Sequence, residues 1–304
     1  MRTNPEISAV IPFYGDPADT LELIAQLQAQ TIADRIEIVV SDDHSPTPFP
    51  QTEGVKVVRR STNGGFGSNV NTGAETATGE WLFILNSDLS LTPDFAEKTL
   101  AVARAEGDVL LSPQVLGQDG QSQYVGRSFP STFQFAWEWF TPLARFRNTT
   151  WWHQAVGHDT DCVSGVTKRV DWVMGACMIL RRETFERIGG MDERYFMNSE
   201  EVDFQRRLKN RGIDRVFAGD LTVEHVGGAS SGASDLRRQW VLNSRYIYSR
   251  KWRQGKYLTP ALKATTWANF CVNVLRQRFN PAVDARAIKD SELSLINTAE
   301  SRAR

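Results

Sequence analysis

The densest group of side chains that could do chemistry contains three carboxylates, Glu200, Glu201 and Asp203. They come after the glycine pair Gly189-Gly190 and lead into residues of helical composition. Acids buried at a loop-to-helix junction are costly, and their pKa values are set by burial and by neighbouring charges. Such a cluster can provide a general base that takes a proton from a substrate hydroxyl. In a purely structural alternative, Glu200 and Asp203 pair with arginines such as Arg206 and fix the loop.

A second set of polar residues follows short apolar runs that are predicted to be strands. Asp42 comes after Ile36–Val40, and Asn86 and Asp88 come after Trp81–Leu85. Ligands of open α/β sheets bind outside the carboxyl ends of the strands, so we expect these side chains to gather at one edge. Asp42 can accept a hydrogen bond from a base or a ribose. Its alternative role is that of a turn or helix-cap aspartate.

Asn86 and Asp88 are two positions apart and therefore share one face of an extended chain. Oxygen ligands in such a pair can hold Mg²⁺ or Mn²⁺, with substrate phosphates completing the coordination. The alternative is a polar strand end followed by a helix cap. His225 follows another strand-like run. It becomes a candidate metal ligand only if the fold brings it to Asp88.

The glycine-rich turn Asn63-Gly64-Gly65-Phe66-Gly67 precedes a predicted helix. Glycines permit close approach of a ligand to the backbone, and N–H groups at the start of a helix favour anions. The turn therefore suits a nucleotide or a diphosphate, although no Walker lysine and no GxGxxG pattern accompanies it.

These motifs are carried by strands that alternate with helices. This alternation predicts an α/β fold with a mainly parallel sheet flanked by helices. The predicted strands are Ile7–Ile11, Ile36–Val40, Val55–Val58, Trp81–Leu85, Val109–Leu111 and Asp171–Leu180, and the predicted helices are Pro17–Gln30, Gly67–Thr76, Pro93–Glu106 and Arg181–Ile188.

The formal net charge of −1 conceals an uneven distribution of charge. Residues 236–283 contain ten Lys or Arg and no Asp or Glu, so this segment carries +10 and the remainder −11. Tryptophans and tyrosines are interleaved with these cations, which suits an anionic membrane surface. The alternative is a solvated helical appendage that packs its aromatic side chains on the core. No motif supports nucleic-acid binding. We expect a main domain over residues 1–235 and a basic, aromatic-rich helical extension over residues 236–304.

Composition and cysteine usage bear on the compartment. The three cysteines form no CxxC pair and no evident zinc set, and an odd number of cysteines without a leader favours a reducing compartment. The sequence shows no signal peptide and no apolar run of the roughly 20 residues that span a bilayer. We expect a cytoplasmic protein that can lie at the inner face of the cell membrane.

An aromatic-rich stretch, residues 122–170, contains Trp137, Trp139, Trp151 and Trp152. One interpretation is a loop with core packing, and another is a platform on which a sugar or lipid acceptor stacks.

The order and spacing of these motifs resemble family 2 glycosyltransferases with the GT-A fold, over roughly Ile7 to Ser231. Within that family the sequence looks most like bacterial rhamnosyltransferases of cell-wall and surface polysaccharide synthesis. The motifs that carry the resemblance are Val10-Ile11-Pro12-Phe13-Tyr14, Val39-Val40-Ser41-Asp42-Asp43, the glycine-rich turn, Asn86-Ser87-Asp88, Trp172-Val173-Met174-Gly175-Ala176-Cys177, Gly190-Met191-Asp192-Glu193, Tyr195-Phe196-Met197, Glu200-Glu201-Val202-Asp203 and Glu224-His225-Val226-Gly227-Gly228.

The resemblance implies a role for each part of the site. It implies that the donor nucleotide and its sugar are held by Pro12, Tyr14, Asp42, Asn63, Gly65, Asn86, Asp88, Gly175 and Ala176. It implies that Asp88 and His225 bind the metal, and that Trp172 and Tyr195 lie on the acceptor side. One acid of the Glu200 and Glu201 pair, expected to be Glu201, would deprotonate the acceptor hydroxyl.

The implied activity is an inverting, metal-dependent transfer of a sugar, with rhamnose favoured. The donor would be dTDP- or UDP-linked, and the acceptor a hydroxyl of a glycan or of a polyprenyl-diphosphate-linked molecule. Alternatives are a galactofuranosyl or other hexosyl transferase, a sugar nucleotidyltransferase, and a non-catalytic sugar-binding relative. Two residues depart from the family pattern: Asn86 stands where aspartate is frequent, and Glu201 where the base is commonly aspartate.

Overall fold

The computed structural model describes residues 5–225 and 235–303, so Val226-Gly227-Gly228 of the last motif lies outside the described residues. The chain divides into two compact units. The first comprises Met1–Ser128 and Asp161–Gly232, and the second comprises Phe129–Thr160 and Ala233–Arg304. The two units are described separately below.

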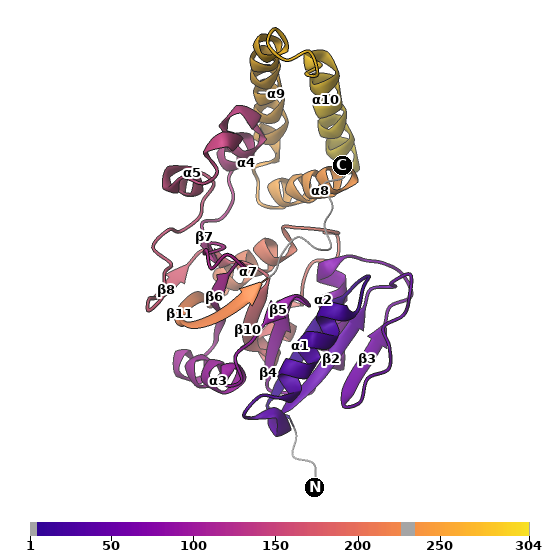
Figure 1. Ribbon diagram of the computed structural model, residues 1–304, viewed down its shortest axis with the longest axis vertical. Helices are drawn as coiled ribbons and strands as arrows, with labels where there is room; N and C mark the ends of the chain where they lie inside the picture. Colours follow the sequence, from indigo (N-terminus) through magenta and orange to yellow (C-terminus); the bar gives the residue numbers. More distant parts are fainter. Residues whose placement is uncertain (1–4, 226–234, 304) are drawn as a thin grey trace. The chain divides into compact units, whose positions relative to one another are not determined.

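The first unit is built on a mixed sheet with the strand order β3-β2-β1-β4-β10-β6-β11-β5 (Figure 1). Strands β3, β2, β1 and β4 are parallel neighbours, and β6 and β11 form a further parallel pair. Between these two groups, β10 runs antiparallel to both β4 and β6. The strands are β1 (Ile7–Phe13), β2 (Ile36–Asp42), β3 (Val55–Arg59), β4 (Trp81–Leu85), β5 (Leu89–Ser90), β6 (Val109–Leu116), β8 (Thr167–Val170), β10 (Cys177–Arg181) and β11 (Asp214–His225).

The strand directions determine which residues share an edge. Since β1, β2, β4, β6 and β11 run the same way, their carboxyl ends lie at one edge of the sheet. The reversed β10 brings its amino end, just after Gly175 and Ala176, to that same edge. Residues that follow the first strand and residues at the end of β11 therefore lie along the same edge of the sheet.

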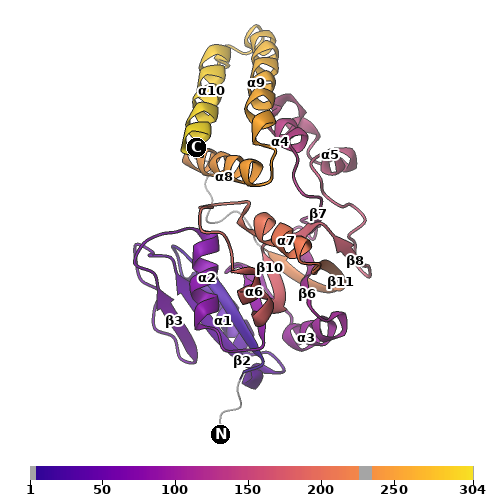
Figure 2. The ribbon, with the colours of Figure 1, turned by 180° about the vertical axis from the view of Figure 1, so that it is seen from behind.

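Buried apolar strands form the core of this unit. All five residues of β4 are buried, as expected for a continuous apolar run covered on both faces. Figure 1 shows α1 on one face of the sheet, and Figure 2 shows α2, α6 and α7 on the opposite face. These helices and the shorter elements of this unit are α1 (Ala18–Gln28), η1 (Ala33–Arg35), α2 (Phe66–Thr76), α3 (Phe95–Glu106), β7 (Gly126–Arg127), β9 (Trp172–Val173), α6 (Arg182–Ile188) and α7 (Glu200–Asn210).

The predicted strand over Asp171–Leu180 is two strands in the structure, β9 and β10, with Met174–Ala176 between them. β9 pairs with β7 in a separate two-stranded sheet, whereas β10 joins the main sheet. The break lets the chain leave one sheet and enter the other beside the carboxyl end of β4.

The second unit is helical. Its elements are α4 (Thr132–Trp139), η2 (Thr141–Phe146), α5 (Thr150–Ala155), α8 (Asp235–Lys251), α9 (Gly255–Gln277) and α10 (Ala285–Arg302). Figures 1 and 2 show α9 and α10 side by side as a hairpin, with α8 at its base. The C-terminal part of this unit begins at Ala233, close to the expected boundary at residue 235, and residues 129–160 group with it. Trp139 explains part of this grouping, since its indole N–H donates to Thr266 of α9 at 2.9 Å.

Candidate active site

Asp88 and His225 meet at the carboxyl edge of the sheet, which is the arrangement that the family resemblance implied. The Oδ1 atom of Asp88 lies 3.1 Å from Nε2 of His225, and Nδ2 of Asn86 lies 3.3 Å from the same nitrogen. Asn86 and Asp88 follow β4, whereas His225 ends β11. The sheet therefore unites residues that are 139 positions apart in the sequence.

Gln123 holds the His225 ring in place, a contact that sequence reasoning missed. Its Nε2 donates to the backbone carbonyl of His225 at 2.9 Å, and its Oε1 lies 2.7 Å from His225 Nδ1. Since a carbonyl can only accept, the Gln123 amide must turn its N–H toward it and its oxygen toward the ring. In the neutral imidazole, Nδ1 therefore carries the proton and Nε2 presents its lone pair to Asp88 and Asn86.

This arrangement fits a divalent cation. Two acceptors, Asp88 Oδ1 and His225 Nε2, lie 3.1 Å apart, and a cation bound by both would offset the repulsion of their lone pairs. Hydrogen bonding of the second ring nitrogen is the usual way in which proteins orient a ligating histidine. Among the residues that the structure describes, no group of three or more His, Cys, Asp or Glu is placed to hold a metal. In the described part of the chain the candidate ligands of this kind are therefore Asp88 and His225, with the Asn86 amide beside them.

Glu200 and Glu201 form the first turn of α7. They follow Asn198 and Ser199, whose φ angles of 64° and 73° lie in the left-handed region. Side chains with a Cβ adopt this region at a cost of about 1–2 kcal/mol each. Strain of this kind is concentrated at functional sites, where the surrounding structure maintains it. Here it sets the direction in which the two glutamates enter the helix.

The two glutamates have raised pKa values. Burial raises the pKa of Glu200 well above its ordinary value, and the charge of Glu201 adds to the effect. Burial also raises the pKa of Glu201, although backbone N–H groups and the charge of Arg127 partly offset it. One carboxylate oxygen of each, Oε2, is buried and accepts no hydrogen bond from the residues that the structure describes. Carboxyls in such surroundings are suited to exchanging protons near neutral pH.

Two glycines pack closely against the side chains of the two glutamates. A Cβ on Gly67 would lie 3.2 Å from Glu200 Cβ, and a Cβ on Gly175 would lie 3.3 Å from Glu201 Cγ. The next residue, Ala176, accepts a hydrogen bond from the backbone N–H of Asn86 at 2.9 Å. The Gly175–Ala176 segment therefore lies between the candidate base and the Asp88–His225 pair.

Arg127 is the second contributor that sequence reasoning missed. It lies in β7, its guanidinium stands 5.1 Å from the centre of the Trp172 ring, and its charge lowers the pKa of Glu201. Gln123 and Arg127 thus belong to one short segment, which orients His225 through Gln123 and affects the pKa of Glu201 through Arg127. No residue pattern in the sequence distinguishes either of them from an ordinary surface residue.

In this structure Asp42 has the structural role that was the alternative to nucleotide binding. Its side chain is buried and accepts from the backbone N–H of Ser45 at 2.8 Å and of Phe49 at 3.2 Å, and it pairs with Arg59. Burial alone would raise its pKa, but these hydrogen bonds together lower it. The carboxylate that was expected near the nucleotide base is therefore already hydrogen-bonded to donors of the protein itself.

The glycine-rich turn is likewise occupied by a protein group. The backbone N–H groups of Gly64 and Gly65 donate to the carboxylate of Asp43 at 2.9 and 2.7 Å. The expectation that these groups are open to a diphosphate is wrong for this conformation, because Asp43 takes the place of the anion. Gly65 has a different reason to be glycine: its φ is +84°, and a Cβ would lie 1.9 Å from the carbonyl oxygen of Phe196.

The remaining predicted donor residues differ in exposure. Tyr14 and Asn63 are exposed, and Pro12 is half-buried at the end of β1. The Tyr14 ring, which follows the first strand, is therefore accessible for stacking on a base.

The two predicted acceptor residues are buried. Trp172 donates its indole N–H to the carbonyl of Ser128 at 2.9 Å. Tyr195 has no exposed surface, and its hydroxyl lies 3.4 Å from Oδ1 of Asp203. In this conformation Tyr195 offers no face to an acceptor. Asp203 forms an ion pair with Arg207 at 3.0 Å, which agrees with the structural alternative of a pairing with an arginine.

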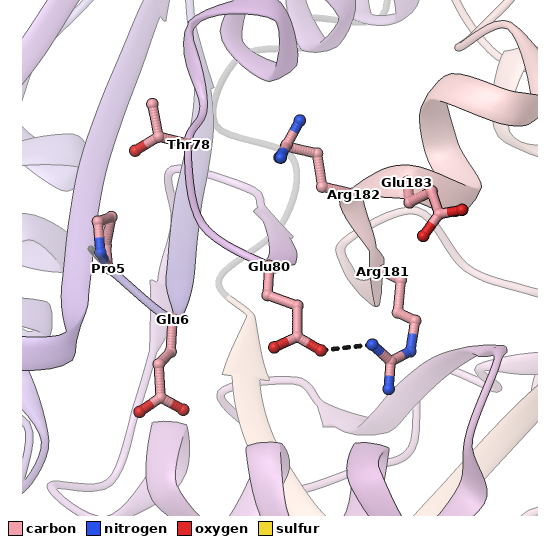
Figure 3. Close-up of a pocket in the computed structure, with 7 residues that line it drawn as sticks. All are labelled: Pro5, Glu6, Thr78, Glu80, Arg181, Arg182 and Glu183. Atoms are coloured by element: carbon pink, nitrogen blue, oxygen red, sulfur yellow. Dashed lines mark hydrogen bonds and ion pairs between the residues drawn. The ribbon is translucent and has the colours of Figure 1, made fainter. Parts of the chain in front are cut away.

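A hollow of about 410 Å³ lies elsewhere in the first unit (Figure 3). Its lining includes Glu6 before β1, Glu80 before β4 and Arg181 at the end of β10, which places it at the opposite edge of the sheet. Figure 3 shows the ion pair between Glu80 and Arg181 within this lining. The hollow contains none of the candidate site residues.

Comparison with known proteins decides the family. The family described as Glycosyl transferase family 2 matches residues 8–189, which is more than half of the chain. The chain belongs to glycosyl transferase family 2. The matched range contains β1, β2, β4 and the Gly175–Ala176 segment, whereas Glu200, Glu201 and His225 lie beyond it.

Two relatives of this family 2 chain have informative names. It is 26% identical over 245 residues to the N-acetylglucosaminyl-diphospho-decaprenol L-rhamnosyltransferase of Mycobacterium tuberculosis, covering 74% of this chain and 78% of the relative. It is 25% identical over 280 residues to the O-antigen biosynthesis protein RfbC of Myxococcus xanthus. That match covers 87% of this chain but 21% of the relative, so the chain spans only about a fifth of that protein.

Solved structures establish the GT-A glycosyltransferase fold. The mannosyltransferase PcManGT from Pyrobaculum calidifontis, in complex with GDP-Man and Mn²⁺, aligns with a TM-score of 0.55 at 13% identity. This alignment covers 99% of the family 2 chain and 87% of PcManGT. GalNAc-T7 with UDP, GalNAc and Mn²⁺ aligns with a TM-score of 0.54 at 16% identity, covering 81% of this chain and 48% of that one.

Proposed function

We propose that this family 2 glycosyltransferase moves a sugar from a nucleoside-diphosphate donor to an acceptor hydroxyl with inversion, and that Glu201 is the base. One observation carries the proposal. The Gly175–Ala176 segment contacts Glu201 on one side and Asn86 on the other. A donor whose diphosphate lies by Asp88 and His225 would thus have its sugar within reach of a carboxyl with a raised pKa.

In the proposed reaction, Glu201 accepts the proton of the acceptor hydroxyl. The hydroxyl oxygen forms a bond to the anomeric carbon while the bond from that carbon to the phosphate oxygen breaks. The nucleoside diphosphate leaves with the electron pair of the broken bond. Attack from the face opposite the leaving group inverts the anomeric centre, and a single base suffices because the acceptor is the nucleophile.

Asp88 and His225 are the residues that would hold Mg²⁺ or Mn²⁺, with Gln123 keeping the ring turned toward the site. Such an ion, when bound, neutralises charge that develops on the departing diphosphate. The two solved relatives were both determined with Mn²⁺, which supports the assignment.

For the sugar and the acceptor, we propose L-rhamnose and a polyprenyl-diphosphate-linked glycan. The support is the name of the mycobacterial relative, which specifies both an L-rhamnosyl group and a diphospho-decaprenol carrier. The name of the Myxococcus relative specifies O-antigen synthesis and supports a role in surface polysaccharide formation.

A thermal-shift panel tests the donor. The chain is heated with dTDP-rhamnose, UDP-galactofuranose, UDP-glucose or GDP-mannose, each with and without Mn²⁺. A ligand at about 100 times its Kd stabilises the folded state by about 2.7 kcal/mol. We expect the largest rise in Tm with dTDP-rhamnose plus Mn²⁺. A larger rise with another sugar would overturn the rhamnose assignment, and the absence of any metal-dependent rise would overturn the site.

A further inference from the structure

The side of α9 turned away from the helical unit carries a continuous apolar stripe. It consists of Trp267, Cys271, Val274 and Leu275, with Phe279 just beyond the helix end. The first four positions follow the three- and four-residue spacing of one helix face. Trp267 is 52% exposed, Leu275 57% and Phe279 90%. We call these five residues the outer face of α9.

The inner side of the same helix is partly polar. Thr266, Asn269 and Asn273 are buried, and Asn269 donates to the buried Glu292 of α10 at 3.2 Å. It also donates to the carbonyl of Trp139 at 3.0 Å. A helix of a water-soluble protein ordinarily turns its apolar stripe inward and its polar side to solvent. In this part of α9 that polarity is reversed, which indicates that the outer face meets a medium other than water.

The charge around the outer face selects the medium. Arg276 and Arg278 are exposed at the end of α9 and Arg286 at the start of α10. The nearby exposed acids are Asp284 and Asp290, and Asp290 pairs with Lys289 at 3.1 Å. Residues 236–283 as a whole carry ten cations and no acid. Large apolar side chains flanked by arginines match the boundary between anionic headgroups and acyl chains.

Among the described residues, no helix is long and apolar enough to cross a bilayer. We propose that the outer face of α9 docks on the surface of an anionic lipid bilayer without crossing it. The proposal goes beyond the sugar transfer and does not depend on it, since it rests on residues of the second unit only. Trp267 lies at the headgroup level in this arrangement, with Lys289 5.1 Å from the centre of its ring.

Co-sedimentation of the full chain with vesicles tests the docking. Vesicles of phosphatidylcholine alone are compared with vesicles that contain about one third phosphatidylglycerol. The wild-type chain should bind the anionic vesicles, and added salt should weaken the binding. The double variant L275E/F279E should bind at least about tenfold more weakly, because two apolar side chains no longer enter the lipid. The double variant R276E/R278E should lose the preference for phosphatidylglycerol.

A single-substitution control is Leu21→Glu, which places one glutamate on an exposed leucine of α1 in the first unit. It should bind like the wild type, and Tm values should show that all variants are folded. Equal binding by L275E/F279E and the wild type would overturn the proposal, as would equal binding to both kinds of vesicle. A wild-type dimer in light scattering that L275E/F279E converts to a monomer, without vesicle binding, would assign the outer face to a second copy and also overturn it.

Discussion

Glu200 and Glu201 are adjacent in the sequence but face different surroundings. Glu200 is almost fully buried against Gly67, whereas Glu201 is half-buried against Gly175 and feels the charge of Arg127. The exposure of Glu201 and its contact with the Gly175–Ala176 segment favour it as the group that reaches substrate. Glu200 is then its buried neighbour, and the charge of Glu201 helps to raise the pKa of Glu200.

The raised pKa of Glu200 predicts how stability depends on pH. The folded chain keeps the Glu200 proton at pH values where the unfolded chain, with a pKa near 4.5, has released it. The contribution of this residue to the free energy of unfolding therefore falls as pH rises from about 4.5 through the folded pKa. Glu200→Gln should match the wild-type Tm near pH 4.5 and exceed it at pH 8, by a few degrees if the gain is about 1 kcal/mol. An identical Tm difference at both pH values would contradict the assignment.

The Gln123–His225 contact predicts an effect on metal affinity. Gln123→Ala removes the acceptor that holds the Nδ1 proton, so the ring loses its fixed orientation. Mn²⁺ affinity, measured by electron paramagnetic resonance with nucleoside diphosphate present, should fall about 10- to 100-fold. Gln121→Ala, at an exposed position two residues away, is the matched control. Affinity within about twofold of the wild type in Gln123→Ala would show that the ring needs no such support.

At the scale of elements, the approach to α7 is fixed by the start of α2. Gly65 is the N-cap residue of α2, and the carbonyl of Phe196 leaves no room for a side chain there. The loop that carries Phe196 continues through the strained Asn198 and Ser199 into the two glutamates. The position of the candidate base thus depends on a contact between two elements more than 100 residues apart.

A pair of glycine substitutions separates this contact from backbone strain. Gly65 and Gly107 have nearly equal φ angles, +84° and +83°, but nothing lies within 4 Å of a Cβ on Gly107. Gly107→Ala should cost about 1–3 kcal/mol of unfolding free energy from backbone strain alone. Gly65→Ala should cost clearly more and should also lower transferase activity, since the Phe196 loop must move. Equal costs in chemical denaturation, with unchanged activity, would show that the contact is unimportant.

At the scale of the whole molecule, the chain joins a unit with the GT-A fold to a helical unit with a polar centre. Asn269 is the hub of that centre: its side chain accepts from the backbone N–H of Thr141 at 3.1 Å and donates to Trp139 and Glu292. These bonds link the segment around residue 140 to α9 and α10. They explain why residues 129–160 belong to the second unit.

Removing the hub should loosen the helical unit. Asn269→Leu leaves several buried groups without partners, and each such group costs about 1–3 kcal/mol. We expect a lowered Tm and faster amide exchange in α4, α9 and α10. Asn297→Leu makes the same change at an exposed position of α10 and should alter stability by less than about 0.5 kcal/mol. Equal effects of the two substitutions would contradict the role of Asn269.

Much of the fold and half of the site could be predicted from local patterns. Apolar periodicity located the strands, and the strand-end rule placed Asn86 and Asp88 at the edge of the sheet. That His225 joins them was implied only by the family resemblance. Partners distant in the sequence could not be predicted. Asp43 takes the N–H groups of Gly64 and Gly65, 21 and 22 positions away, and Gln123 supports a histidine 102 positions away. Such contacts leave no periodic signal, because they depend on which loops the sheet brings together.

The most direct test of the central claim compares sugar transfer and donor binding in Glu201→Gln. Both are measured with Mn²⁺ and the donor that most raises the Tm of the wild type, using a polyprenyl-diphosphate-linked glycan as acceptor. Loss of a general base predicts that kcat falls by at least about 100-fold. Donor Kd should stay within about twofold of the wild type, because Glu201 is assigned to the acceptor proton. Transfer at the wild-type rate by Glu201→Gln would contradict the account.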